Sequence, residues 1–376
     1  MASLTGVRFP AVLMVFLAHL SLIIPFADPK VLEDYHTYIG GIGKVGLSFF
    51  FMLSGFILAW AARENDSPVL FWRRRLVKII PLHWLTFAIA LAVFAGSTVT
   101  AKSGIMNLLM VQGWSSDPAV FGSVNAPSWS LTCLCFFYLL FPLLHRGVTR
   151  IRAQYLWWCA GAIAAAVVAV PAVVRAVIPA DAQLPPGAPA TSVDAFWIVD
   201  LLPATRLLDF VLGIVMARIV RSGRWIGVRP LPLAALVFVA YFASLDLPPE
   251  YRIAATTIVP LALFIASLAG SDLAGRKTVL AGRPIQVLGD VSYAFILIHW
   301  PVMNFFLKVF GEERLYSVPF AVAVGVLDLV VSIALAWVLT VTVEKPLVRL
   351  LAKPRKKAEP AVAASPASSP TRASSL

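Results

Sequence analysis

The sequence carries little charge for its length. Only 13% of its 376 residues are Asp, Glu, Lys or Arg, whereas 60% are hydrophobic and the mean hydropathy is +0.85. Soluble globular chains carry about 25% charged residues, so a water-soluble protein of two or three domains is excluded, and so are a disordered chain, a collagen and a coiled coil. The apolar excess runs nearly from end to end, which indicates one body that crosses a membrane several times.

Cysteine is also scarce. The chain has three, Cys133, Cys135 and Cys159, and all of them lie in apolar runs. This placement favours neither a disulfide framework nor a thiolate zinc site. We therefore predict buried, unreactive thiols, no metal site and no bound cofactor.

The chain lacks the marks of a cleaved signal peptide and of internal domain boundaries. The first apolar run, Phe9 to Phe26, has no basic n-region and no small-residue cleavage site, so we expect a retained helix. No repeat of fixed period and no long Gly/Ser-rich linker divides the body. The prediction is one transmembrane domain over 1–351, followed by a disordered cytoplasmic tail over 352–376.

Ten apolar runs have about the 17–25 residues that a helix needs to cross a bilayer. They lie roughly at 9–26, 45–61, 77–96, 128–145, 154–178, 205–220, 231–246, 253–270, 290–310 and 317–343. The sequence therefore predicts an all-α, polytopic membrane bundle of about ten transmembrane helices.

Basic residues are concentrated in alternate loops between these runs. The predicted loop 63–78 and the segments near 146–152, 218–229 and 276–283 carry many of them, as does the chain after 345, whereas acidic residues dominate the other loops. Because Lys and Arg mark cytoplasmic loops, we predict that both termini are cytoplasmic. This asymmetry accounts for most of the excess of basic residues behind the net charge of +12, so no nucleic-acid partner is expected.

Ionisable residues inside membrane spans are costly and are candidates for function. Here they are His19, His83, Arg206, Asp209, His299 and Asp328. Arg8 and His19 are eleven positions apart, which is three helical turns plus about 20°, so they share one helix face and lie about 16 Å apart along the axis. The alternative is an interfacial arginine and a hydrogen-bonded core histidine.

Seven segments of the chain resemble, in the same order, landmarks of the acyltransferase family 3 membrane proteins. They are LTGVRFPAVLMVFLAHL, GKVGLSFFFMLSGFILAW, FWRRRLVKIIPLHWL, PSWSLTCLCFFYLLFP, RLLDFVLGIVMAR, SYAFILIHWPVM and the terminal VEKP. Each motif alone is weak, but together they extend from residue 4 to 346. The resemblance implies a multi-pass protein of the cell membrane, which is the inner membrane in a bacterium.

The resemblance also implies an activity. Members of this family transfer acyl groups from acyl-CoA to hydroxyls on sugars, cell-envelope polymers and antibiotics. We expect an acetyl or other short acyl group, a sugar, glycan or macrolide/polyketide acceptor, and acyl-CoA as a donor substrate rather than a bound cofactor. Membrane lipid is the other expected partner, and the oligomeric state is left open.

Histidine fits the role of general base, because its pKa near 6.5 allows it to accept a proton from a hydroxyl near neutral pH. His19 is the candidate base. Arg8, on the same face, is a further candidate catalytic residue, which would contact the pantetheine or phosphates of CoA or polarise the thioester. His299 should reach a comparable depth, although its tryptophan-proline motif also suits a structural role. We expect direct transfer without a covalent acyl-enzyme, because Cys133 and Cys135 lie where a thiol stays protonated.

Four basic residues precede the third apolar run and are candidates for binding the phosphates of CoA: Arg73, Arg74, Arg75 and Lys78. The alternative is that they set topology and contact anionic lipid. The resemblance implies that further residues line a substrate tunnel, namely Ser54, Trp129, Ser130, Tyr138 and Arg206. Packing is the alternative for these, and for Arg206 the i,i+3 spacing to Asp209 favours an internal ion pair.

Two departures from the family pattern matter. Leu134 stands where the family has a glutamate, which removes a carboxylate that would orient the histidine or bind the acceptor. Arg75 and Lys78 stand where two arginines are common, which keeps the charge but loses one bidentate fork. Because of Leu134, the alternative function is a non-catalytic transporter or lipid-binding scaffold with the same fold.

Overall fold

The computed structural model describes residues 1–62, 67–179, 191–311 and 314–351. In these residues the chain is helical, and the only β-type pairing is an isolated bridge between Phe26 and Tyr316. The long helices are α2 (Arg8–Ile23), α4 (Ile42–Ala61), α5 (Pro68–Val93), α8 (Trp129–Arg150), α9 (Leu156–Val177), α11 (Pro203–Arg221), α12 (Pro230–Ser244), α13 (Ile258–Leu273), α14 (Arg283–Phe310) and α15 (Val318–Leu339). The all-α membrane bundle is confirmed, and each predicted apolar run overlaps one of these helices. The predicted tail, 352–376, lies outside the described residues.

Within the described residues, seven helical segments are long and apolar enough to cross a membrane. They contain α2, α4, α5, α8, α9, α14 and α15. The helices α12 and α13 have 15 and 16 residues, and α11 contains several charged side chains. At a rise of 1.5 Å per residue, a 15-residue helix spans about 23 Å, less than the roughly 30 Å of a hydrocarbon core. Ten crossings and cytoplasmic termini therefore stay predictions.

Short helices join the long ones, and local sequence explains where several of them begin. They are α1 (Ala2–Gly6), α3 (Pro29–Tyr35), α6 (Ala101–Leu108), α7 (Pro118–Phe121), α10 (Val193–Phe196) and α16 (Lys345–Leu351). Asp28, Asp117 and Ser192 each accept a backbone N–H at a helix start, and Thr100 forms a capping box with Ser103. Such caps satisfy amide groups that a helix leaves unpaired.

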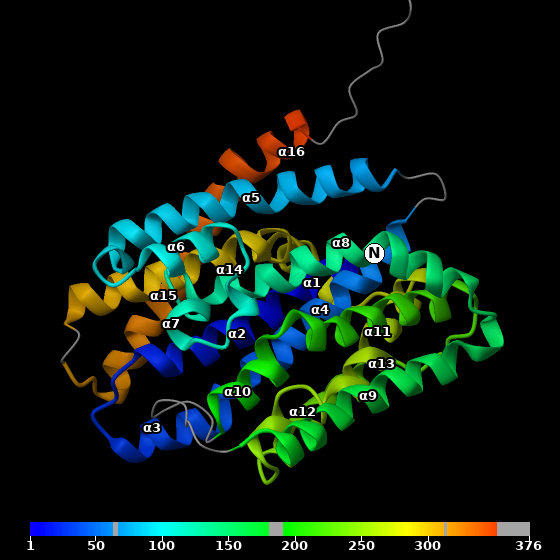
Figure 1. Cartoon of the computed structure of the whole chain (residues 1–376), viewed down its shortest axis with the longest axis horizontal. Helices are drawn as coiled ribbons and strands as arrows, with labels where there is room; N and C mark the ends of the chain where they lie inside the picture. The colour runs from blue at the N-terminus through cyan, green and yellow to red at the C-terminus, as the bar shows by residue number, and fades with distance from the viewer. Residues whose placement is uncertain (63–66, 180–190, 312–313, 352–376) are drawn as a thin grey trace, which may run out of the picture.

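The predicted loop 63–78 is only partly a loop. Helix α5 begins at Pro68, which suits the first helical turn because proline has no N–H to pair. Arg73, Arg74, Arg75 and Lys78 therefore lie on a helix, where they do not all point in the same direction, and Arg63 lies outside the described residues. Figure 1 shows α5 with α16 along one edge of the bundle and α9 and α12 along the opposite edge.

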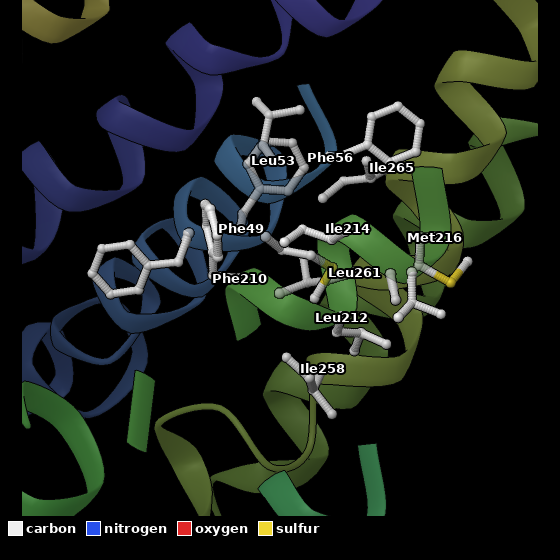
Figure 2. Packing of buried hydrophobic residues seen from close by; sticks show 14 of the residues in the cluster. Phe49, Leu53, Phe56, Phe210, Leu212, Ile214, Met216, Ile258, Leu261 and Ile265 are labelled. Atoms are coloured by element: carbon white, nitrogen blue, oxygen red, sulfur yellow. The ribbon is translucent and has the colours of Figure 1, made fainter. Parts of the chain in front are cut away.

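The helices α4 and α11 form the centre of the main hydrophobic core. Figure 2 shows Phe49 and Phe56 of α4 beside Phe210 and Ile214 of α11. A Cβ added at Gly55 of α4 would overlap the carbonyl oxygen of Phe210, so the two backbones touch. Small residues permit such close approach between membrane helices, and the contact fixes the position of α4.

Helix α2 is held in the same way. A Cβ added at Gly43 or Gly46 of α4 would lie 2.7 Å from the Ala18 Cβ or 2.5 Å from the Ala11 carbonyl oxygen. On its other side α2 packs against α14, where the Phe295 ring lies 5.8 Å from that of Phe16. The helix that contains both Arg8 and His19 is thus placed by contacts on two sides.

Candidate active site

Two cavities lie end to end along α2. The inner cavity has a volume of about 160 Å³ and contains the side chains of Arg8, Arg75 and Lys78 among mainly apolar walls. The outer cavity has a volume of about 360 Å³, and its lining includes His19 and Trp129. The terms inner and outer follow the predicted orientation of the chain.

One face of α2 lines both cavities. Arg8 and Val12 face the inner cavity, Val15 faces both, and His19 and Leu22 face the outer cavity. These positions are separated by steps of four and three residues, which is the period of one helix face. The predicted alignment of Arg8 with His19 is confirmed, and each of the two lies in a different chamber.

The cavities meet at four residues that line both of them. They are Val15 of α2, Leu47 of α4, Ser130 of α8 and Ile296 of α14, and we call this set the junction. Ser130 donates its hydroxyl hydrogen to the Pro127 carbonyl at 2.9 Å. The junction is therefore mainly aliphatic, and none of its four members is charged.

A pair of imidazoles lies immediately beyond the junction. The Nδ1 atom of His19 is 2.8 Å from Nε2 of His299, and the two ring planes differ by only 6°. His299 is completely buried, whereas His19 is partly accessible from the outer cavity. The expectation that His299 reaches a depth comparable to that of His19 is confirmed.

The hydrogen bonds of this pair determine where its protons lie. Nδ1 of His299 is 3.1 Å from the Phe295 carbonyl oxygen, which can only accept, so this nitrogen carries the proton. In a neutral imidazole the other nitrogen is then an acceptor, and Nε2 of His299 accepts from Nδ1 of His19. The remaining nitrogen of His19, Nε2, is left with a free lone pair. The arrangement makes His19 a proton acceptor at the outer cavity.

Aromatic rings surround the imidazole pair. The indole of Trp300 contacts His19 edge-on at 5.4 Å between ring centroids, and the Phe16 ring lies 6.2 Å from that of His299. This packing fixes the two rings relative to each other. It also separates His299 from the cavity that His19 lines.

The basic cluster predicted from the sequence divides in two. Arg75 and Lys78 line the inner cavity together with Arg8, whereas Arg73 and Arg74 are not part of its lining. The reason is helical phase, because residues 75 and 78 lie three positions apart on one face of α5 while 73 points to the other side. Two of the four predicted residues thus lie with Arg8.

A carboxylate that the charge analysis did not single out lies in this group. Glu344 is 3.5 Å from the ammonium of Lys78 and is almost completely buried. It ends the π-helical turn Thr340–Glu344 that follows α15, an irregularity that is often found at functional sites. The sequence feature that pointed to Glu344 was the terminal VEKP motif, which contains it.

The polar residues predicted to line a tunnel are found in both cavities. Ser54 and Tyr138 line the inner one, where their hydroxyl oxygens are 3.3 Å apart, and Trp129 lines the outer one. Ser130 belongs to the junction. Leu134, which replaces the family glutamate, lines the inner cavity and not the chamber of His19.

Arg206 lines neither of the two cavities. Its guanidinium is 2.9 Å from the carboxylate of Asp209 and donates to the hydroxyl of Ser48 at 2.6 Å. The ion pair predicted from the i,i+3 spacing is confirmed, and both partners are almost completely buried. Arg206 therefore connects α11 to α4, and it does not line the chamber of either histidine.

Sequence reasoning missed several residues of the outer cavity. His36 bonds the Ser21 carbonyl at 2.7 Å, and Lys44 forms an ion pair with the buried Asp200. The Lys44 ammonium also lies 4.6 Å from the centre of the Phe196 ring. Lys44 and Asp200 are 156 positions apart, so no local sequence pattern indicates their contact. Lys44 itself lies within the motif GKVGLSFFFMLSGFILAW.

The remaining intramembrane candidates have local partners. Asp328 accepts a hydrogen bond from Ser332 at 3.1 Å, and the imidazole of His83 bonds the Asn107 carbonyl at 2.9 Å. Cys133 is buried beside the Leu201 carbonyl. Over the described parts of the chain, no three His, Cys, Asp or Glu side chains gather as metal ligands would.

Comparison with known proteins identifies relatives over most of the chain. The model of an acyltransferase domain, that of acyltransferase family 3, matches residues 1–339. Acyltransferase MdmB of Streptomyces mycarofaciens is 42% identical over 364 residues, which cover 94% of this chain and 93% of that protein. Exopolysaccharide production protein ExoZ of Rhizobium meliloti (strain 1021) is 26% identical over 273 residues, which cover 69% and 76%. No solved structure matches the chain significantly.

Proposed function

The chain belongs to acyltransferase family 3, and we propose that it transfers a short acyl group from acyl-CoA to a hydroxyl of a sugar, glycan or macrolide-type acceptor. The observation that carries the proposal is the position of His19. His19 lines the outer cavity about one helical turn beyond the junction, its Nε2 takes no part in the hydrogen bond to His299, and the cationic inner cavity lies on the other side of the junction.

The inner cavity suits the donor. CoA bears several phosphate charges, and Arg8, Arg75 and Lys78 bring three cations to one chamber. Glu344 neutralises part of this charge through Lys78 and so holds one of the cations in place. In the proposed orientation, with cytoplasmic termini, this chamber faces the compartment that supplies acyl-CoA.

The outer cavity suits the acceptor. Aromatic side chains at Trp129, Phe196 and Tyr241 offer flat apolar surfaces, and the cavity is larger than the inner one. The name of the relative ExoZ refers to exopolysaccharide production. Both points support a sugar or glycan hydroxyl, and a glycosylated macrolide presents the same chemistry.

Transfer is then direct. His19 Nε2 accepts the proton of the acceptor hydroxyl, and the oxygen attacks the thioester carbonyl at the junction. A carbon–oxygen bond forms, the carbon–sulfur bond breaks, and His19 returns the proton to the departing thiolate. CoA leaves by the inner cavity as the thiol. His299 acts on this step only through His19, whose Nδ1 proton it binds, and is therefore a positioning residue.

The contrasting reading, a transporter or lipid-binding scaffold without catalysis, rested on Leu134. That residue lines the inner cavity, while the orienting partner of His19 is His299. The missing carboxylate therefore removes no contact from the proposed base.

The test is acyl transfer by the purified protein. We expect labelled acetyl-CoA and a panel of sugars and macrolides to yield a product in which the label is in an alkali-labile ester. An alkali-resistant amide would show that an amine is acylated. Absence of transfer to every acceptor, despite acyl-CoA binding, would favour the non-catalytic reading.

A further inference from the structure

The junction is the place where the linings of the two chambers overlap, and its composition differs from both of them. The inner cavity presents three cations, and the outer cavity presents imidazoles, aromatic rings and the cations Lys44 and Arg252, whereas the junction consists of three branched aliphatic side chains and one serine. The serine hydroxyl donates to a backbone carbonyl, so its hydrogen is already bonded. Phosphate groups placed at the junction would lose the cations that bind them in the inner cavity. Only the uncharged end of the donor fits this segment.

The junction also lies at a fixed distance from the base. Val15 precedes His19 by four residues on α2, and Ile296 precedes His299 by three residues on α14. One helical turn is about 5.4 Å, so both junction residues lie about one turn before the imidazole pair. A thioester carbonyl within reach of His19 therefore has its neighbouring atoms between Val15 and Ile296.

One wall of the junction cannot move outward. Gly43 and Gly46 bring the backbone of α4 against that of α2, and these two helices contain Leu47 and Val15. Helix α4 is fixed in turn on its other side by the contact of Gly55 with α11. The space available at the junction is set by side-chain size rather than by helix movement.

From these observations we infer that Val15, Leu47 and Ile296 determine which acyl groups the protein transfers. The inference rests on the proposed function and adds a specificity device to it. A longer acyl chain would have to displace these side chains or extend into the outer cavity, where it would occupy the position of the acceptor. The junction therefore selects short, uncharged acyl groups.

The experiment measures transfer rates from acetyl-, propionyl-, butyryl- and hexanoyl-CoA with one acceptor. Leu47→Ala and Ile296→Ala each remove three carbons from the junction. Each should raise the ratio of the butyryl or hexanoyl rate to the acetyl rate by about tenfold or more, because one methylene in an apolar pocket changes discrimination by about 10–200-fold. Val15→Leu should lower the same ratio.

Matched controls separate a change at the junction from general loosening of the bundle. Leu13→Ala and Ile333→Ala make the same truncations at partly buried positions that line neither cavity, and the chain-length ratio should not change. Leu47 and Ile296 lie on different helices, so if one variant fails to fold the other carries the test.

Two results would overturn the inference in different ways. If the wild type transfers acetyl and every folded junction variant keeps its chain-length ratio, the junction does not select the acyl group and the proposed function stands. If the wild type transfers no acyl group from any of the four thioesters, the proposed function fails, and the inference fails with it.

Discussion

The inner and outer cavities share α2 as a common wall but are built on different chemistry. The inner cavity gathers three permanent cations, and one of them, Lys78, has the buried carboxylate of Glu344 beside it. In the outer cavity Lys44 is paired with the buried Asp200, and the group that faces the junction is a hydrogen-bonded imidazole. Under the proposed function this difference is a division of labour, in which charge holds the donor at one end and a neutral base acts at the other.

The strongest test of this division is removal of the base. His19→Ala should lower the transfer rate by about 10²–10⁴-fold, the usual contribution of a general base, while acyl-CoA affinity changes little because the cations are in the other chamber. Single-turnover transfer and equilibrium binding of acyl-CoA measure the two effects separately. His145→Ala is a suitable control, since this partly buried histidine lines neither cavity. Near-normal turnover by the His19 variant would contradict the assignment.

A smaller effect is expected at the partner imidazole. His299→Ala leaves the Nδ1 proton of His19 without its acceptor and should reduce kcat by about 10–100-fold, the usual cost of losing a group that orients a functional ligand. The KM for acyl-CoA should not change. His299→Gln should restore part of kcat, because its side-chain oxygen can accept the same hydrogen bond.

Comparison of the two alanine variants also identifies which imidazole is the base. If His299→Ala is folded and inactive while His19→Ala still turns over, the base belongs to α14. If both variants are active, acceptor deprotonation depends on neither imidazole, and the proposed mechanism is wrong even though the family assignment holds.

The smallest effects should come from the inner cavity. Arg75→Gln and Lys78→Gln should each raise the KM for acyl-CoA by about tenfold, the value of one charge-assisted hydrogen bond, with kcat nearly unchanged. The difference from wild type should shrink at high salt, because screening weakens the wild type as well. Titrations at two ionic strengths measure this. Arg73→Gln, on the other side of α5, should raise KM less, and an equal effect would mean that the whole cluster binds the donor.

The parts of this site that could be predicted are those that lie within one helix. Arg8 and His19 are related by the helical repeat alone, and the Arg206–Asp209 pair by its i,i+3 spacing. The contact between His19 and His299 joins residues 280 positions apart, so only their shared depth could be anticipated. No local pattern encodes which helices become neighbours.

The division of the basic cluster could have been predicted in part. The apolar run suggested a helix from residue 77, which placed Arg73, Arg74 and Arg75 in a loop where all are equivalent. Because α5 begins at Pro68, these residues instead occupy defined directions around a helix axis. Pro68 after Ser67 was the available signal, since proline is common in the first turn of a helix.

The arrangement of two chambers that meet only at the junction has a consequence for the order of events. A donor that enters from one end leaves the other end open, so the acceptor can arrive before or after it. CoA leaves by the inner cavity and the acylated acceptor leaves by the outer cavity, so neither product blocks the release of the other. Under the proposed function, the kinetic scheme that follows is a ternary complex that donor and acceptor can enter in either order.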